Sequence, residues 1–105
     1  NEFETASMDK IGLIPEIVVR YRSTYFTHIT GGYSAGYYSY VWSEVLDADA
    51  FAAFQENGLF DQETAAAFRT NILERRGAED PEVLYLRFRG QEPSVEALLK
   101  RRGWK

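Results

Sequence analysis

Hydrophobic and polar positions divide the chain into an irregular first third and a later part with clear helix signals. In the later part, apolar residues recur at helical spacing and predict helices over residues 61–76, 81–89 and 95–102. Both ends of these segments carry the residues that begin and end helices. The starting signals are Asp61, Asp80 followed by Pro81, and Ser94, and the ending signals are Gly77, Gly90 and Gly103.

A longer helix is predicted before these, over residues 33–57. It starts near Tyr33 or Ser34 and ends before Gly58. We expect it to bend or restart around residues 47–49, because aspartate caps helices better than it fills their interiors. Its core-facing side would carry Tyr38, Val41, Val45 and Ala52.

The beginning of the chain is less regular. Residues 3–11 read as the end of a helix that stops at Gly12, and residues 17–19 are β-branched and favour a strand. Residues 11–32 are therefore expected to be irregular or briefly extended, with a loop at 27–32. The predicted fold class is mainly α, in a single domain over residues 1–105.

The composition of the chain excludes several classes of function. The 105 residues and 12.1 kDa fit one domain. The sequence contains no run of eighteen apolar residues, so it predicts no membrane span. The net charge of −4 argues against binding of nucleic acid. There is no cysteine, which fits a reducing compartment, so the cytoplasm is the default location and the periplasm an alternative. The single histidine, His28, cannot build a multi-histidine zinc site within this chain.

One stretch is chemically unusual. Residues 23–43 carry no Asp, Glu, Lys or Arg, and six of the seven tyrosines lie between positions 21 and 40. On one continuous helix, Tyr33, Tyr37, Tyr40 and Glu44 would share a face. Such a row of phenols could hydrogen-bond a peptide backbone or a developing oxyanion. We assign no role to Glu44.

The alternative is a purely structural role, in which the tyrosines pack with their hydroxyls hydrogen-bonded within the protein and His28 caps a helix or packs.

The pair Gly31-Gly32, which precedes the tyrosine row, permits positive φ and gives the loop freedom to move. Gly36 is a poor helix former, which suggests that another segment packs closely there. The acidic stretch over residues 44–63 reads as a solvated helix face, and the basic C-terminus as a tail or a partner for those acids.

The motif over residues 26–46 resembles the C-terminal part of the thimet oligopeptidase family of zinc metallopeptidases. The run is His-x-x-Gly-Gly-Tyr-x-x-x-Tyr-Tyr-x-Tyr-x-Trp from His28 to Trp42, and matches continue in order through residues 47–51, 68–73, 80–81, 88–90 and 92–93. Bacterial peptidyl-dipeptidase is the member it resembles most. The likeness implies the helical C-terminal portion of a two-lobed, zincin-type peptidase.

That resemblance also implies site residues. Tyr33 and Tyr40 would donate to the oxyanion, His28 and Tyr37 would hold the substrate backbone, and Gly31-Gly32 would form a mobile loop that closes on peptide. The family's His-Glu-x-x-His motif is absent here. Zinc and its ligands are therefore expected upstream of Asn1, with no metal held by this chain, which is expected to be an inactive fragment of a peptidase that releases dipeptides from short peptides.

A rival hypothesis is a free-standing helical domain that binds a peptide or sugar through the tyrosine face, without catalysis. The two hypotheses differ in what the surface should look like. A separated lobe should expose a large apolar patch where the N-terminal remainder would pack, and it could dimerise through that patch.

Overall fold

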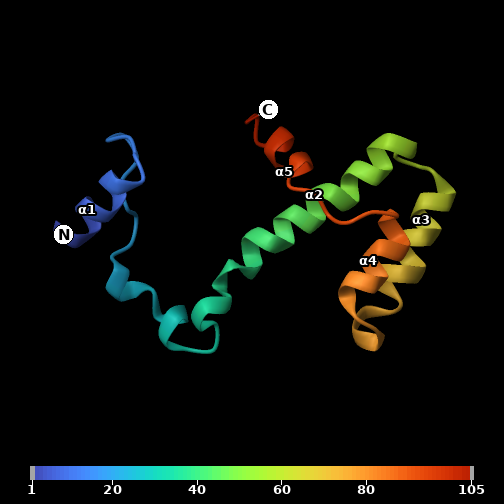
Figure 1. The fold of residues 1–105 in the computed structure, drawn as a ribbon, viewed down its shortest axis with the longest axis horizontal. Coiled ribbons are helices and arrows are strands. Elements are labelled where there is room, and N and C mark those ends of the chain that lie inside the picture. Colours follow the sequence, from blue (N-terminus) through green and yellow to red (C-terminus); the bar gives the residue numbers. More distant parts are fainter. Residues whose placement is uncertain (1, 105) are drawn as a thin grey trace. The chain divides into compact units, whose positions relative to one another are not determined.

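The computed structural model describes residues 2–104, and over these residues it is helical without a strand. The mainly α prediction is confirmed. The chain divides into two compact units, residues 1–37 and 38–105, and each is described by itself (Figure 1). No helix within residues 2–104 combines the length and the apolar composition needed to cross a bilayer.

The first unit begins with α1 (Glu2–Lys10), which ends before Gly12 at φ 70°, as the sequence predicts. The Glu4 carboxylate ties α1 to the following segment, since it accepts from the Ser23 amide at 2.7 Å and from Arg22 at 2.9 Å. Two 3-10 turns follow, η1 (Ser23–Tyr25) and η2 (Thr27–Thr30).

The predicted strand at residues 17–19 is wrong. These residues form no strand, and all three side chains are exposed. β-Branched residues favour a strand only where neighbouring strands pack against them, and the described residues contain no strand to supply that pairing.

In the second unit, α2 (Ser39–Asn57) is the longest helix, and its start differs from the prediction. Residues 34–38 form a separate 3-10 helix, η3 (Ser34–Tyr38), so residues 33–57 are not one α-helix. Ser34 has φ 42°, a strained entry for a residue with a side chain, and Gly36 lowers the helix propensity of the next turn.

The predicted bend of this helix around residues 47–49 is also wrong, because α2 is continuous there. Asp49 does not cap a new helix. Its side chain is 2% exposed, and its carboxylate accepts a hydrogen bond from the Tyr85 hydroxyl at 2.7 Å. A tertiary partner thus overrides the local preference of aspartate for helix ends.

The predicted helix over residues 61–76 changes type along its length. The Asp61 side chain caps α3 (Gln62–Phe68) by accepting from the Thr64 amide, as expected. The chain then widens into a π-helical turn, η4 (Arg69–Leu73), and a 3-10 turn, η5 (Arg76–Ala78). The left-handed position predicted for Gly77 falls instead on Arg76 at φ 42°, while Gly77 has φ −89°.

The last two helices agree closely with the sequence. α4 (Pro81–Arg89) is capped by Asp80, begins at the proline and ends at Gly90 with φ 74°. For α5 (Glu96–Arg101), the Ser94 hydroxyl accepts from the Glu96 amide, and Gly103 follows the helix at φ 73°.

Two small clusters form the core of this unit. In one, Leu98 of α5 packs on Val45 and Ala48 of α2, and Figure 1 shows α5 beside α2. In the other, Ala53, Tyr85 and Phe88 join α2 to α4, with partly buried Phe54 and Phe68 around them. The expected core residues Tyr38 and Val41 are exposed, and Ala53 is buried more deeply than Ala52.

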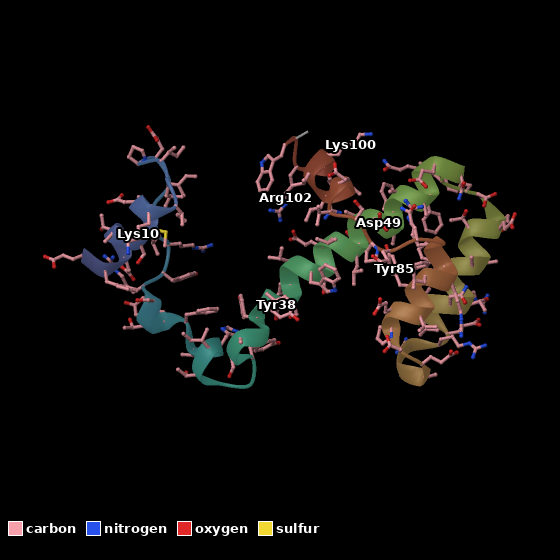
Figure 2. The ribbon with its side chains drawn as sticks, in the orientation of Figure 1. Lys10, Tyr38, Asp49, Tyr85, Lys100 and Arg102 are labelled. Carbon is pink, nitrogen blue, oxygen red and sulfur yellow. The ribbon has the colours of Figure 1, made fainter. Side chains whose placement is uncertain are left out.

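A polar network, buried except for Glu56, joins α2 and α4, and Figure 2 labels two of its members, Asp49 and Tyr85. The Arg89 guanidinium donates to Asp49 at 3.2 Å and makes two hydrogen bonds of 2.8 Å to Glu56. These bonds raise the pKa of Arg89 and lower that of Glu56, while burial and the Asp49 carboxylate raise the pKa of the Tyr85 hydroxyl. Asp49 is therefore not part of the solvated acidic face predicted from the sequence.

The predicted pairing of the basic C-terminus with the acidic stretch is confirmed. Arg101 donates to Asp47 at 2.7 Å, and Arg102 pairs with Glu44. Both pairs connect α5 and the residue after it to α2. They are exposed, so each contributes little to stability by itself.

Candidate substrate-contacting site

The first unit holds a compact cluster of aromatic rings. The His28 ring lies 5.4 Å from Tyr33 and 5.2 Å from Tyr37, measured between centroids, and the two tyrosine rings lie 5.9 Å apart. Phe26 completes the cluster, with its ring edge-on to Tyr37 at 4.6 Å. Three of the predicted site residues are therefore brought together.

His28 combines this packing with access to solvent. Its side chain is exposed, and its ring nitrogens make no hydrogen bond to any residue in the described part of the chain. An imidazole held by three rings has a restricted orientation and keeps both nitrogens available to a ligand. The His28 side chain therefore caps neither of the neighbouring 3-10 turns, η1 and η2.

The cluster arises differently from the way the sequence predicted. Tyr33 precedes η3 and Tyr37 lies within it, so α-helical spacing does not bring their rings together. The 3-10 turn does, because the Gly36 amide donates to the Tyr33 carbonyl at 2.7 Å and closes the chain between them. The prediction that one α-helical face carries Tyr33, Tyr37 and Tyr40 is therefore wrong in its geometry.

The glycine pair does not use the positive φ that its sequence permits. Neither Gly31 nor Gly32 has positive φ. A Cβ added at Gly31 would lie 3.4 Å from the Thr27 carbonyl oxygen, in contact with the η2 turn but without a clash. Around Gly32 and Gly36 the space is open, and the close neighbour expected at Gly36 is not found among the described residues.

Tyr40 belongs to the second unit. It lies in the first turn of α2, and its side chain is 53% exposed. Glu44 lies one turn later on the same helix, and it forms one of the ion pairs expected between the acidic stretch and the basic C-terminus, with Arg102.

Phe26 is the member of the cluster that sequence reasoning did not select. It lies two residues before His28, outside any helical repeat, and only its place directly before η2 brings it onto Tyr37. The available signal was the aromatic density of residues 21–40, which includes Phe26 but does not say which rings meet.

The potential metal ligands of this chain are scattered within residues 2–104. The sequence has one histidine and no cysteine, and no group of three potential ligands lies together within residues 2–104. Zinc in proteins is bound by three or four such side chains.

Comparison with known proteins identifies the family. The chain matches Peptidase family M3 over residues 2–104. This chain belongs to peptidase family M3. The match covers both units, so the aromatic cluster and the network on α2 and α4 lie in one family region.

Individual relatives support the assignment. The chain is 54% identical over 81 residues to oligopeptidase A of Escherichia coli, an alignment that covers 76% of this chain and 12% of that protein. It is 42% identical over 104 residues to dipeptidyl carboxypeptidase of Salmonella typhimurium, covering 97% of this chain and 15% of the relative. A probable cytosolic oligopeptidase A of Arabidopsis thaliana is 52% identical over 83 residues. The chain thus spans less than a sixth of the length of these M3 relatives.

Proposed function

We propose that the intact protein is a zinc metallopeptidase that hydrolyses short peptides and releases C-terminal dipeptides. In this proposal residues 1–105 supply substrate contacts and oxyanion stabilisation. The observation that carries it is the cluster of His28, Tyr33 and Tyr37 within a chain that belongs to peptidase family M3. The dipeptide specificity rests on the match to dipeptidyl carboxypeptidase, which covers nearly the whole chain.

His28 and Tyr37 hold the substrate backbone. Both side chains lie in the aromatic cluster, where ring contacts fix their orientation at little cost in rotamer entropy. An imidazole N–H and a phenol O–H are neutral donors for peptide carbonyl groups. Gly31 and Gly32 lie directly after η2 and allow the substrate to approach the backbone.

Tyr33 and Tyr40 donate hydrogen bonds to the oxyanion of the tetrahedral intermediate. A phenol donor stabilises this state more than the ground state, because the acceptor gains negative charge during the reaction. Both phenols are partly exposed, at 45% and 53%, and can be reached by a substrate.

The zinc ligands and the general base belong, in this proposal, to the parts of the protein outside these residues. That remainder also packs on the exposed apolar surface of this chain, which taken alone could pair with a second copy instead. We place the intact protein in the cytoplasm, as the name of the Arabidopsis relative says of that protein. The chain by itself should hydrolyse no peptide, with or without added zinc.

The test is Tyr40→Phe in the intact protein. Loss of one oxyanion donor should lower kcat by about 10² to 10³ and leave KM nearly unchanged. Tyr38→Phe is the matched control, because Tyr38 is a neighbouring and more exposed tyrosine to which we assign no role. An unchanged kcat in Tyr40→Phe, or an equal loss in Tyr38→Phe, would contradict the proposed role.

A further inference from the structure

A groove between α2, α3 and α4 is not used by the proposed function. Its volume is about 660 Å³, and it lies wholly within the second unit. Apolar side chains from all three helices and from η4 line it: Trp42, Leu46, Ala50, Phe68, Ile72 and Leu84.

One wall of the groove is a regular line along α2. Trp42, Leu46 and Ala50 follow each other at intervals of four residues and so lie on one face of the helix. The line is about 12 Å long, which corresponds to a little over two helical turns. Trp42 leaves 47% of its surface exposed at one end of this line.

The charged side chains of the lining are mostly acidic. They are Asp47, Asp80, Glu82 and Arg76. Asp47 is already paired with Arg101, and the Asp80 carboxylate caps α4 by accepting from the Glu82 amide. The Glu82 side chain forms no ion pair with any residue between 2 and 104. An apolar floor with acidic residues at its margin favours an apolar segment flanked by Lys or Arg.

The length of the relatives suggests where such a segment comes from. This chain covers 12% of oligopeptidase A and 15% of dipeptidyl carboxypeptidase, so most of such a protein lies outside it. A second copy is a poorer occupant, because each copy carries a net charge of −4 and would bring a further acidic margin against the first.

We propose that the groove binds an amphipathic helix from the part of the intact peptidase outside these 105 residues. Its apolar face contacts Trp42 and Ile72, and its Lys or Arg side chains face Glu82. A helix suits the site because helices form the walls, and no strand edge exists within residues 2–104 for an extended segment to join. The inference rests on the proposed function only in requiring a longer protein.

Photo-crosslinking in the purified intact protein tests the proposal. Trp42→p-benzoylphenylalanine places a photoreactive aromatic group in the groove at a site that already holds a large ring. Irradiation should join it to a peptide of the same polypeptide outside residues 1–105, and that peptide should contain Lys or Arg. Mass spectrometry identifies the peptide. Gln62→p-benzoylphenylalanine, at an exposed polar side chain of α3 outside the groove, is the control and should give at most a small yield.

A charge variant gives a second readout. Glu82→Lys, combined with the label at position 42, should lower the crosslink yield severalfold, and Glu63→Lys, outside the groove, should not. Crosslinks confined to residues 1–105, a crosslinked dimer, or no crosslink at all would overturn the proposal. Peptidase activity is measured on the same samples, so a protein that crosslinks as expected but shows no activity would contradict the proposed function alone.

Discussion

The two units of this chain differ in how their side chains are held. In residues 38–104 nine side chains are buried, and they include the polar pair Asp49 and Thr64. In residues 2–37 none is buried, although this unit holds the His28 cluster. The second unit therefore has a core of its own. The first unit holds its aromatic rings on the surface, where they gain little stability from burial.

Stability and the candidate chemistry are therefore separated along the chain. Contacts of rings in a small, exposed cluster contribute about 0.5–1.5 kcal/mol each, which is too little to hold a backbone by themselves. Mutations in the second unit should accordingly act on folding, and mutations in the cluster should act on catalysis.

The largest expected effect on stability is at Phe88. This residue is 9% exposed and packs edge-on against Phe68 and Tyr85. Phe88→Ala should lower the free energy of unfolding by about 3–5 kcal/mol, measured by chemical denaturation of the chain. Phe26→Ala, in the exposed cluster, is the control. An equal loss in the free energy of unfolding in that variant would contradict the claim that the second unit carries the stability.

A smaller effect is expected at the buried network. Asp49→Asn keeps an acceptor for the Tyr85 hydroxyl but removes the charge opposite Arg89. We expect a loss of about 1–3 kcal/mol, because Arg89 keeps Glu56 as its partner. Asp47→Asn is the comparison, since Asp47 forms an exposed ion pair and its replacement should change stability much less. If the two variants lost the same free energy of unfolding, burial of the Asp49 carboxylate would not increase its contribution to stability.

The smallest effect is that of pH on the second unit. Hydrogen bonds from Arg89 lower the pKa of Glu56 below its ordinary value of 4.5, and Arg87 lowers that of Glu79. A lowered folded-state pKa contributes stability that is present above pH 4.5 and is lost as the pH falls through the folded-state value. Denaturation between pH 6 and pH 3 should show this decline. Glu56→Gln should make it shallower, by less than about 1 kcal/mol.

Helix boundaries were predictable where the sequence carries local signals. Asp61, the Asp80-Pro81 pair and Gly90 act through hydrogen bonds and dihedral angles that depend on nearby residues alone, so their roles follow from the sequence. The bend expected at Asp49 fails because its partners, Tyr85 and Arg89, are about forty residues away. No local sequence pattern indicates a pairing between residues so far apart.

The candidate site was predictable in its members but only partly in its geometry. The resemblance to the thimet oligopeptidase family implies His28, Tyr33 and Tyr37 as site residues, and these three rings lie together. The continuous helix expected to align them is replaced by a 3-10 turn with Ser34 at φ 42°. Positive φ at a serine is uncommon. The sequence has three glycines nearby that can adopt positive φ more readily, so nothing in it indicates that Ser34 would be the residue to do so.

Hydrogen exchange in the intact protein, with and without a peptide that it cannot hydrolyse, shows whether the cluster of His28, Tyr33 and Tyr37 contacts substrate. If His28, Tyr33 and Tyr37 contact substrate, amides in residues 27–38 should exchange more slowly when the peptide is bound. The amides of α4, which we place outside the site, should exchange at the same rate in both states. Unchanged exchange in residues 27–38 at saturating peptide would contradict the account.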